Sequence, residues 1–244
     1  MRIDVAFSPA GLSKDEVAGR GVFVIDVLRA TTTMCAALHH GARSIVPVAA
    51  IADAMAMAQT LGPDIVLIGE RHGRPIEGFA LGNSPLEMTE ERVRGKTLVM
   101  TTTNGTGALL AAAGAAQVFV AAAVNLSVAT ARMRQLVADG SSVLVLCAGR
   151  DGRFGIDDAY TAGRLIAPIV GERRRLEGLN DAAIAALDLV RRYGSRWERP
   201  FARSAAGRHL VSIDMAADVA EAALPDRYPV LPVFHDRRVQ LSGT

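Results

Sequence analysis

The chain of 244 residues is poor in cysteine, in aromatic residues and in lysine. Its 2 cysteines, Cys35 and Cys147, are too few and too far apart for the disulfide framework of a small secreted protein. Aromatic residues make up 5% of the chain and are not interleaved with basic runs, which argues against a nucleic-acid groove built on stacking. The N-terminus carries Asp4 and lacks an apolar core of signal-peptide length, so we expect a cytoplasmic protein.

One long segment lacks charge altogether. No charged residue lies between Lys96 and Arg132, and the mean hydropathy of the whole chain is +0.24. A membrane-spanning helix needs about 20 apolar residues. Asn, Gly and Thr interrupt the segment, however, and such clusters mark turns and loops. We therefore expect buried strands and short helices here, and no membrane span.

The charge balance is nearly neutral, at +2, and 25 of the 27 basic residues are arginine because the only lysines are Lys14 and Lys96. Arginine is suited to bidentate contact with carboxylate and phosphate groups. The run at 173–175 is interpreted as solvated surface rather than as a site.

Short apolar runs alternate with alanine-rich helical patterns, which is typical of an α/β sheet covered on both faces. The predicted strands are Ile3–Phe7, Val22–Val27, Ser44–Val48, Ile65–Gly69, Thr97–Thr101, Gln117–Ala121 and Val143–Cys147. The predicted helices are Thr32–His40, Ala50–Leu61, Gly105–Ala113, Ser127–Asp139, Ile156–Gly171 and Asp181–Tyr193, with further helices in Ser204–Glu221 broken at Ile213–Asp214. We expect one domain over residues 1–244, a three-layer α/β/α sandwich with a mostly parallel or mixed sheet.

A weak internal repeat relates residues 22–48 to residues 97–121. Both read as strand, threonine-rich loop, helix, Gly-Ala and strand. Duplication of a β-loop-α-β unit and chance similarity of small and apolar residues explain the pattern equally well.

Four polar loops follow predicted strands, and ligands of open α/β sheets bind at the carboxyl ends of strands. In the first loop, DVLRATTT, Asp26 ends an apolar strand, where a charge is costly unless it is paired or bound to a metal. Arg29, Thr31 and Thr32 then place a cation and hydroxyls at the start of a helix, which suits an anion. A structural Asp26–Arg29 pair with a threonine cap is the alternative.

The second loop, GERHGRPIEGFALGNSP, spans residues 69–85 and shows no evident secondary structure; loops of this length are commonly functional. Its candidate residues are Glu70, Arg71, Arg74, Asn83 and Ser84. His72 could act as an acid or base, or be a polar surface residue.

The third loop, TTTNGTGA, begins at Thr101 and offers hydroxyls, an amide and glycines between a strand and a helix. Its candidate anion-binding residues are Thr102, Thr103, Asn104, Gly105 and Thr106. It lacks the spacing and the lysine of a Walker loop. A simple helix cap is the alternative.

The fourth loop, CAGRDGRFGIDDAYTAG, begins at Cys147. The spacing of Cys147 and Arg153 resembles that of cysteine phosphatases, although a small buried cysteine is the commoner outcome. Arg150 is a candidate substrate contact. Asp157 and Asp158 begin the next helix, where one could cap it and the other reach a metal.

Together the loops supply carboxylates and arginines. Carboxylates suit Mg²⁺, and no closely spaced His/Cys cluster suggests zinc. Several arginines beside a metal indicate a small substrate with several negative charges, and phosphoryl chemistry follows as the reaction class.

These four motifs, in this order and spacing, resemble those of the 2-phosphosulfolactate phosphatase family. The resemblance covers roughly Val22 to Gly163, with a weaker echo in Ser204–Asp218, where Gly207 and Leu210 precede Asp218. It implies a Mg²⁺-dependent hydrolase that converts 2-phospho-3-sulfolactate to 3-sulfolactate and phosphate on the route to coenzyme M. The family often has Glu-Asp where this chain has Asp157-Asp158, which would change the reach of the first acid.

On this basis we expect Asp26 to hold Mg²⁺ with Glu70, Asp157 or Asp158. Arg29, Arg71 and the loop with Asn104 would neutralise charge on the phosphoryl oxygens. Arg74 and Arg150 would contact the sulfonate and carboxylate, and the remaining candidates in these loops, Cys147 among them, would line the substrate site.

Several alternatives remain open. Asp26 could be a phosphate-accepting nucleophile, although Leu28 stands where a haloacid dehalogenase motif has a second aspartate. Cys147 could also be the nucleophile. A non-catalytic binder of anionic metabolites and a sugar-phosphate isomerase or lyase are the other functional classes. The expected partner is a small anionic molecule, without nucleic acid or membrane, and a homodimer is one open assembly state.

Overall fold

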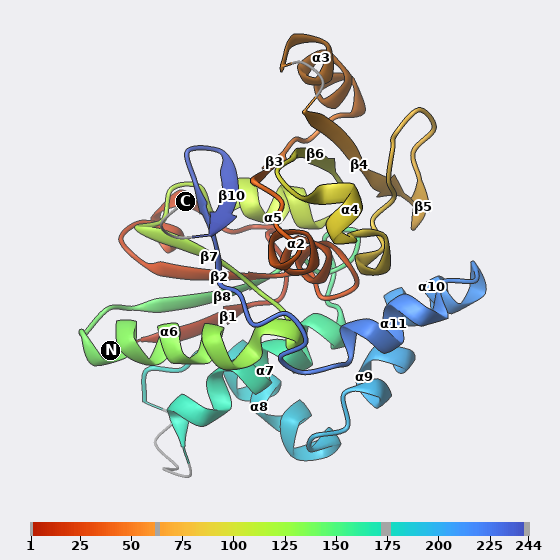
Figure 1. Cartoon of the computed structure of the whole chain (residues 1–244). Coiled ribbons are helices and arrows are strands. Elements are labelled where there is room, and N and C mark those ends of the chain that lie inside the picture. The colour runs from red at the N-terminus through yellow and green to blue at the C-terminus, as the bar shows by residue number, and fades with distance from the viewer. Residues whose placement is uncertain (1, 62–63, 172–176, 242–244) are drawn as a thin grey trace.

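The computed structural model describes residues 2–61, 64–171 and 177–241. Its described residues form a 10-stranded mixed sheet in the order β1-β8-β2-β7-β9-β10-β3-β6-β4-β5 (Figure 1). The strands are β1 (Ile3–Ala6), β2 (Gly21–Ile25), β3 (Ser44–Pro47), β4 (Ile65–Arg71), β5 (Arg74–Pro75), β6 (Thr97–Thr101), β7 (Gln117–Ala121), β8 (Val143–Cys147), β9 (Pro232–His235) and β10 (Arg238–Leu241). The helices are α1 (Lys14–Val17), α2 (Ala30–His39), α3 (Ile51–Leu61), α4 (Glu90–Val93), α5 (Gly105–Ala111), α6 (Leu126–Ala138), α7 (Ile156–Val170), α8 (Asp181–Tyr193), α9 (Glu198–Arg203), α10 (Ala205–Ser212) and α11 (Ala216–Ala222), with 3₁₀ turns η1 (Pro85–Glu87) and η2 (Ala123–Asn125).

The sheet consists of two parallel blocks joined by a hairpin. β1, β8, β2 and β7 pair in parallel, as do β3, β6 and β4. The C-terminal strands β9 and β10 lie antiparallel between β7 and β3. This mixed sheet confirms the predicted fold class.

The two units of the weak sequence repeat interlock in the sheet. β2 and β3 flank α2, and β6 and β7 flank α5. β2 pairs with β7 in one block, whereas β3 pairs with β6 in the other. Each unit therefore contributes one strand to each block, and the loops that begin α2 and α5 are brought together.

Helices cover both faces of the sheet. α6, α7 and α8 lie on one side of the first block, and α6 packs on α7, which packs on α8 (Figure 1). α2 and α5 contact each other on the other side, where they reach strands of both blocks. α9, α10 and α11 form a separate cluster that contacts α7 and η1.

The buried strands explain the apolar composition, since every residue of β2 and β8 is buried. The long uncharged segment divides into β6, α5, β7, η2 and the start of α6. In the part of the chain that the structure describes, no helix has the length and apolar character needed to cross a membrane.

Several element ends differ from the sequence predictions. The strand predicted to end at Val27 stops at Ile25, and the helix predicted from Thr32 begins at Ala30. The segment 69–85 is not structureless, because β4 continues to Arg71 and turns back through β5 before η1.

β9, β10 and the short helices α1, α4 and α9 were not predicted, because four to six residues carry too little periodicity. The predicted break at Ile213–Asp214 is confirmed between α10 and α11. The arginine run at 173–175 lies outside the described residues.

Candidate active site

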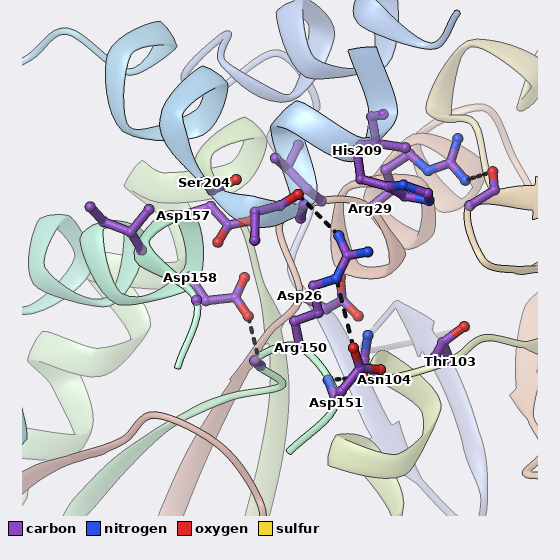
Figure 2. Close-up of a pocket in the computed structure, with 18 of the residues that line it drawn as sticks. Asp26, Arg29, Thr103, Asn104, Arg150, Asp151, Asp157, Asp158, Ser204 and His209 are labelled. Carbon is purple, nitrogen blue, oxygen red and sulfur yellow. Dashed lines mark hydrogen bonds and ion pairs between the residues drawn. The ribbon is translucent and has the colours of Figure 1, made fainter. Parts of the chain in front are cut away.

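A pocket of about 260 Å³ lies where the segments following β2, β4, β6 and β8 meet the start of α10 (Figure 2). Besides His72, it brings together nine residues to which the sequence assigned a catalytic, substrate-binding or metal role. They are Asp26, Arg29, Glu70, Asn83, Thr103, Asn104, Arg150, Asp157 and Asp158. Residues from four separate loops thus share one cavity, as expected of an α/β ligand site.

The loop after β2 is held by its own threonines. Asp26 N–H donates to Thr31 Oγ1 (3.1 Å), and Thr32 Oγ1 donates to the Val27 carbonyl (2.8 Å). Both threonines are buried and neither lines the pocket. Their hydroxyls therefore shape the loop that carries Asp26.

The N-terminus of α5 approaches Asp26 closely. A Cβ built on Gly105 would lie 2.7 Å from Asp26 Oδ2 and 2.5 Å from Ala30 Cβ. Only glycine has room at this position. The threonine-rich loop is likewise braced internally, since Thr106 N–H donates to Thr102 Oγ1 (3.1 Å).

Three buried aspartates lie close enough for their negative charges to raise one another's pKa values. Burial, together with the charges of Glu70 and Asp157, raises the pKa of Asp26 to about 7, although a hydrogen bond from Ala30 and the charge of Arg29 act in the opposite direction. Burial also raises the pKa of Asp157 to about 6. The pKa of Asp158 lies well above its ordinary value because of burial and the charges of Asp157 and Asp26. Carboxylates arranged in this way are short of positive charge.

Two of the acids are already occupied by backbone donors. Asp158 accepts hydrogen bonds from Val27 N (2.9 Å) and Gly149 N (3.0 Å). Glu70 accepts from Gly73 N (2.7 Å) and Thr103 N (2.7 Å). Each of these two carboxylates therefore ties two loops together through both of its oxygens. Asp26 accepts from Ala30 N (3.3 Å) through Oδ1, and Asp157 accepts hydrogen bonds from nearby backbone and from the Ser204 side chain.

Two arginines predicted from the sequence, Arg29 and Arg150, line the pocket. Arg29 is 3% exposed, and its Nη1 lies 2.6 Å from Asp218 Oδ2. Arg150 donates to the Ala205 carbonyl (3.1 Å), and its charge lowers the pKa of Asp157. The sequence alternative of an Asp26–Arg29 pair is not what the structure shows, because the ion-pair partner of Arg29 is Asp218.

Other predicted residues lie outside the pocket lining. Arg71 donates to the Glu70 carbonyl (2.7 Å) of its own strand and to Thr101 Oγ1 (2.9 Å) at the end of β6. Arg74 is exposed on β5. Ser84 donates to Asp218 Oδ1 (2.6 Å). The other predicted residues outside the lining are Thr31, Thr32, Thr102, Gly105, Thr106 and Cys147.

Cys147 is the last residue of β8 and is fully buried. Burial and the charges of Asp158 and Asp157 raise the pKa of its thiol well above the ordinary value. The reactive form of cysteine is the thiolate, so this environment is unfavourable for a nucleophile. Arg153 of the same motif does not line the pocket either.

The C-terminal helices contribute Leu210, which belongs to the weaker family pattern, and further pocket residues to which the sequence assigned no role: Arg203, Ser204, Ala205, Ala206 and His209. His72, considered as an acid or base, also lines the pocket, and its carbonyl lies 2.9 Å from His209 Nε2. The pattern around Gly207 and Asp218 was the one available signal for this region. Glycine is required at Gly207 because a Cβ would lie 2.0 Å from the Phe201 carbonyl oxygen.

The pocket carboxylates provide oxygen ligands of the kind that Mg²⁺ binds. Among the described residues, no three His, Cys, Asp or Glu side chains converge so as to hold a metal by themselves. Mg²⁺ commonly uses only one or two protein carboxylates and completes its shell with water and substrate oxygens. Asp26 and Asp157, buried and mutually repelling, fit such a site.

Comparison with known proteins identifies the family of the chain. The family profile described as 2-phosphosulpholactate phosphatase matches residues 6–237. A protein of Symbiobacterium thermophilum named probable 2-phosphosulfolactate phosphatase is 39% identical over 229 residues, covering 93% of this chain and 96% of the relative. A protein of Carboxydothermus hydrogenoformans with the same name is 35% identical over 235 residues, covering 96% of this chain and 94% of the relative. One of Clostridium acetobutylicum, also so named, is 38% identical over 186 residues, covering 76% and 77%. With matches over nearly its whole length, the chain belongs to the 2-phosphosulfolactate phosphatase family, whose members are phosphoric monoester hydrolases.

Proposed function

We propose that this chain hydrolyses 2-phospho-3-sulfolactate, or a similar small 2-phospho acid with several negative charges, to 3-sulfolactate and phosphate in a Mg²⁺-dependent reaction. The observation that carries the proposal is the composition of the pocket. Buried aspartates whose pKa values remain raised by burial and by neighbouring carboxylates share a cavity of about 260 Å³ with Arg29 and Arg150. A metal-bound polyanion would satisfy both sets of groups.

Asp26 and Asp157 would hold Mg²⁺, because both oxygens of Asp158 and both of Glu70 tie separate loops together through backbone hydrogen bonds, whereas the backbone bond to Asp26 comes from Ala30 of the same segment. When bound, Mg²⁺ would act as a Lewis acid that polarises the phosphoryl group and favours attack by water. Asp158 and Glu70 would keep the loops in register around the substrate. This arrangement assigns two acids to the ion and two to the scaffold.

The chain's own cations and amides would bind and orient the substrate. Arg29 would contact phosphoryl oxygens, where charge is redistributed during transfer. Asn104 accepts a hydrogen bond from Asp151 N (3.1 Å) through Oδ1, which leaves its amide N–H groups to donate into the pocket. Arg150, whose side chain is 35% exposed, would contact the sulfonate or carboxylate at the more open side.

A cysteine nucleophile is disfavoured by the geometry, because Cys147 is buried, outside the pocket lining and held as a neutral thiol. Asp26 as a covalent phosphate acceptor is compatible with its position in the lining. In the proposed reaction, its place beside Asp157 makes it a metal ligand instead.

The test is phosphate release from a panel of 2-phospho acids, with and without Mg²⁺ and with EDTA, together with chromatography of the organic product. We expect release that requires Mg²⁺, is greatest for 2-phospho-3-sulfolactate and persists in Cys147→Ser. Tight binding without release would instead indicate a binder of anionic metabolites. Conversion of the substrate without free phosphate would indicate an isomerase or lyase.

A further inference from the structure

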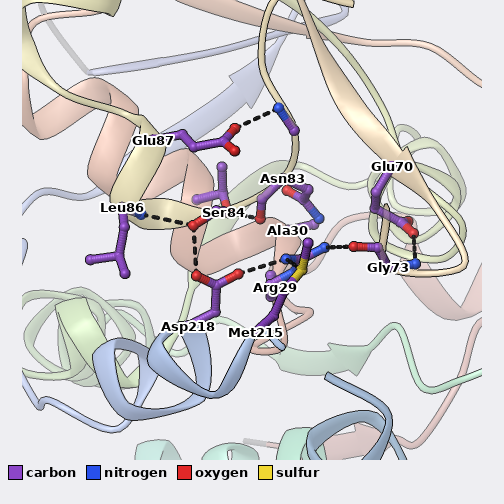
Figure 3. Close-up of polar contacts among 12 residues, drawn as sticks. Arg29, Ala30, Glu70, Gly73, Asn83, Ser84, Leu86, Glu87, Met215 and Asp218 are labelled. Atoms are coloured by element: carbon purple, nitrogen blue, oxygen red, sulfur yellow. Dashed lines mark hydrogen bonds and ion pairs between the residues drawn. The ribbon is translucent and has the colours of Figure 1, made fainter. Parts of the chain in front are cut away.

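A continuous chain of hydrogen bonds surrounds one side of the pocket and includes a residue with no assigned role, Asp218 (Figure 3). Ser84 Oγ donates to Asp218 Oδ1 (2.6 Å), and Arg29 Nη1 donates to Asp218 Oδ2 (2.6 Å). Arg29 Nη2 in turn donates to the Gly73 carbonyl (2.6 Å). Gly73 N–H then reaches Glu70, whose other oxygen accepts from Thr103.

Asp218 and Arg29 form a buried ion pair. Their side chains are 5% and 2% exposed, and both oxygens of Asp218 are used. Arg29 lines the pocket, whereas Asp218 lies behind it on α11 and is not part of the lining. Any influence of Asp218 on a bound substrate must therefore pass through Arg29 or through the stability of the fold.

The contacts of the guanidinium provide a route through Arg29. Arginine has five N–H donors in one rigid plane. Asp218, Gly73 and the Met215 sulfur, 2.7 Å from Nη1, accept three of them. Because the group is planar, contacts to Nη1 and Nη2 from different elements also set the direction of the remaining donors, on Nε and Nη2.

We propose that Asp218 is a positioning residue that holds the Arg29 guanidinium in the orientation needed to bind the phosphoryl group. The proposal rests on the proposed function, and it adds α11 to the elements that determine activity. Ser84 acts in the same direction by anchoring the second oxygen of Asp218. The C-terminal helices thereby control a cation that belongs to the loop after β2.

The test is a double-mutant cycle of Arg29→Ala and Asp218→Asn, measured as kcat/KM with 2-phospho-3-sulfolactate and Mg²⁺ well below each melting temperature. We expect Arg29→Ala to lower kcat/KM by about 10²- to 10³-fold, as for loss of one transition-state donor. Asp218→Asn should lower it by about 10- to 100-fold through misorientation. If Asp218 acts through Arg29, the double variant should be no worse than Arg29→Ala. Effects that multiply would overturn the proposal.

Asp4 provides a matched control. Its side chain is also 5% exposed and is paired with arginines, with Arg20 Nη1 at 2.9 Å, but it lies on β1 and outside the pocket lining. Asp4→Asn should lower the melting temperature and leave kcat/KM within about twofold of wild type. If Asp218→Asn proves unstable, Ser84→Ala offers a milder change. It should lower kcat/KM by about 3- to 10-fold in the wild-type background and have no further effect on kcat/KM in the Arg29→Ala background.

A spectroscopic readout separates this inference from the proposed function. In ¹⁵N NMR spectra assigned with Arg29→Lys, the Nη protons of Arg29 should be resolved in wild type and averaged by rotation in Asp218→Asn. Unchanged Arg29 signals in Asp218→Asn would refute positioning even in an active enzyme. Absence of phosphate release by the wild-type chain would refute the proposed function while leaving the NMR result readable.

Discussion

Replacing Asp26 by asparagine should stabilise the metal-free protein increasingly as the pH rises. The Asp26 carboxyl has a pKa near 3.8 in the unfolded chain and about 7 in the folded protein, where burial disfavours its charge. The unfolded chain therefore releases this proton first, and the free energy of unfolding falls as the pH rises between these values. Asparagine does not titrate, so the variant escapes this loss.

The size of the effect follows from the shift. Each pKa unit corresponds to about 1.4 kcal/mol, so the full cost of ionising Asp26 in the folded protein is about 4 kcal/mol. Roughly 2.5 kcal/mol of this falls between pH 5 and pH 8. For a protein of this size the gain of the variant over wild type should grow by about 5–10 °C in melting temperature over that range.

The assay is thermal unfolding in EDTA at pH 5, 6, 7 and 8, followed by addition of 10 mM Mg²⁺. Mg²⁺ should raise the melting temperature of wild type at pH 8 and have little effect on Asp26→Asn, which should also be inactive. Asp188→Asn serves as the control, because the side chain of Asp188 is 59% exposed. An advantage of Asp26→Asn that stays constant from pH 5 to pH 8 would refute the electrostatic reasoning.

Three further predictions concern neighbouring residues. Cys147→Ser should retain phosphate release within about tenfold of wild type, because the thiol does not line the pocket; loss of activity that is insensitive to EDTA would support the cysteine mechanism instead. Gly105→Ala should reduce kcat by at least about 10²-fold, since its Cβ would collide with Ala30 and Asp26 and displace the loop; near-normal kinetics would show that the loop can yield. Glu70→Gln keeps one acceptor oxygen but loses the charge that binds two backbone N–H groups, so it should lower the melting temperature by about 2–8 °C, measured by calorimetry; an unchanged value would show that these two bonds are not stabilising.

The loops that follow the strands show which pocket residues the local sequence pattern could identify. The order of apolar strand, polar loop and helix identified Asp26, Glu70, Asn104 and Asp157 as neighbours of a ligand, and all four line one pocket. The same pattern could not separate residues that face the cavity from those that brace the loops. Thr31, for example, stands beside the pocket residue Arg29 in sequence, yet its hydroxyl binds the backbone of Asp26.

The second loop shows residues that the structure places outside the pocket lining. Arg71 and Arg74 were predicted to bind the substrate because they are cations in a long polar segment. The structure extends β4 to Arg71 and pairs Arg71 with Arg74 in a tight hairpin, and neither side chain lines the pocket. Alternation of exposed and buried positions in a two-residue strand is too short to be visible in sequence.

The sequence alone determined the α/β class, the main strands and the loops that carry the acids, because periodic burial is a property of neighbouring residues. It also carried the family motifs. Only the tertiary structure decided that β9 and β10 join the two blocks, and that Asp218 pairs with Arg29 across 189 positions of the chain. The physical reason is that a buried charge must find its partner in space, and the course of the whole chain decides which residue that is.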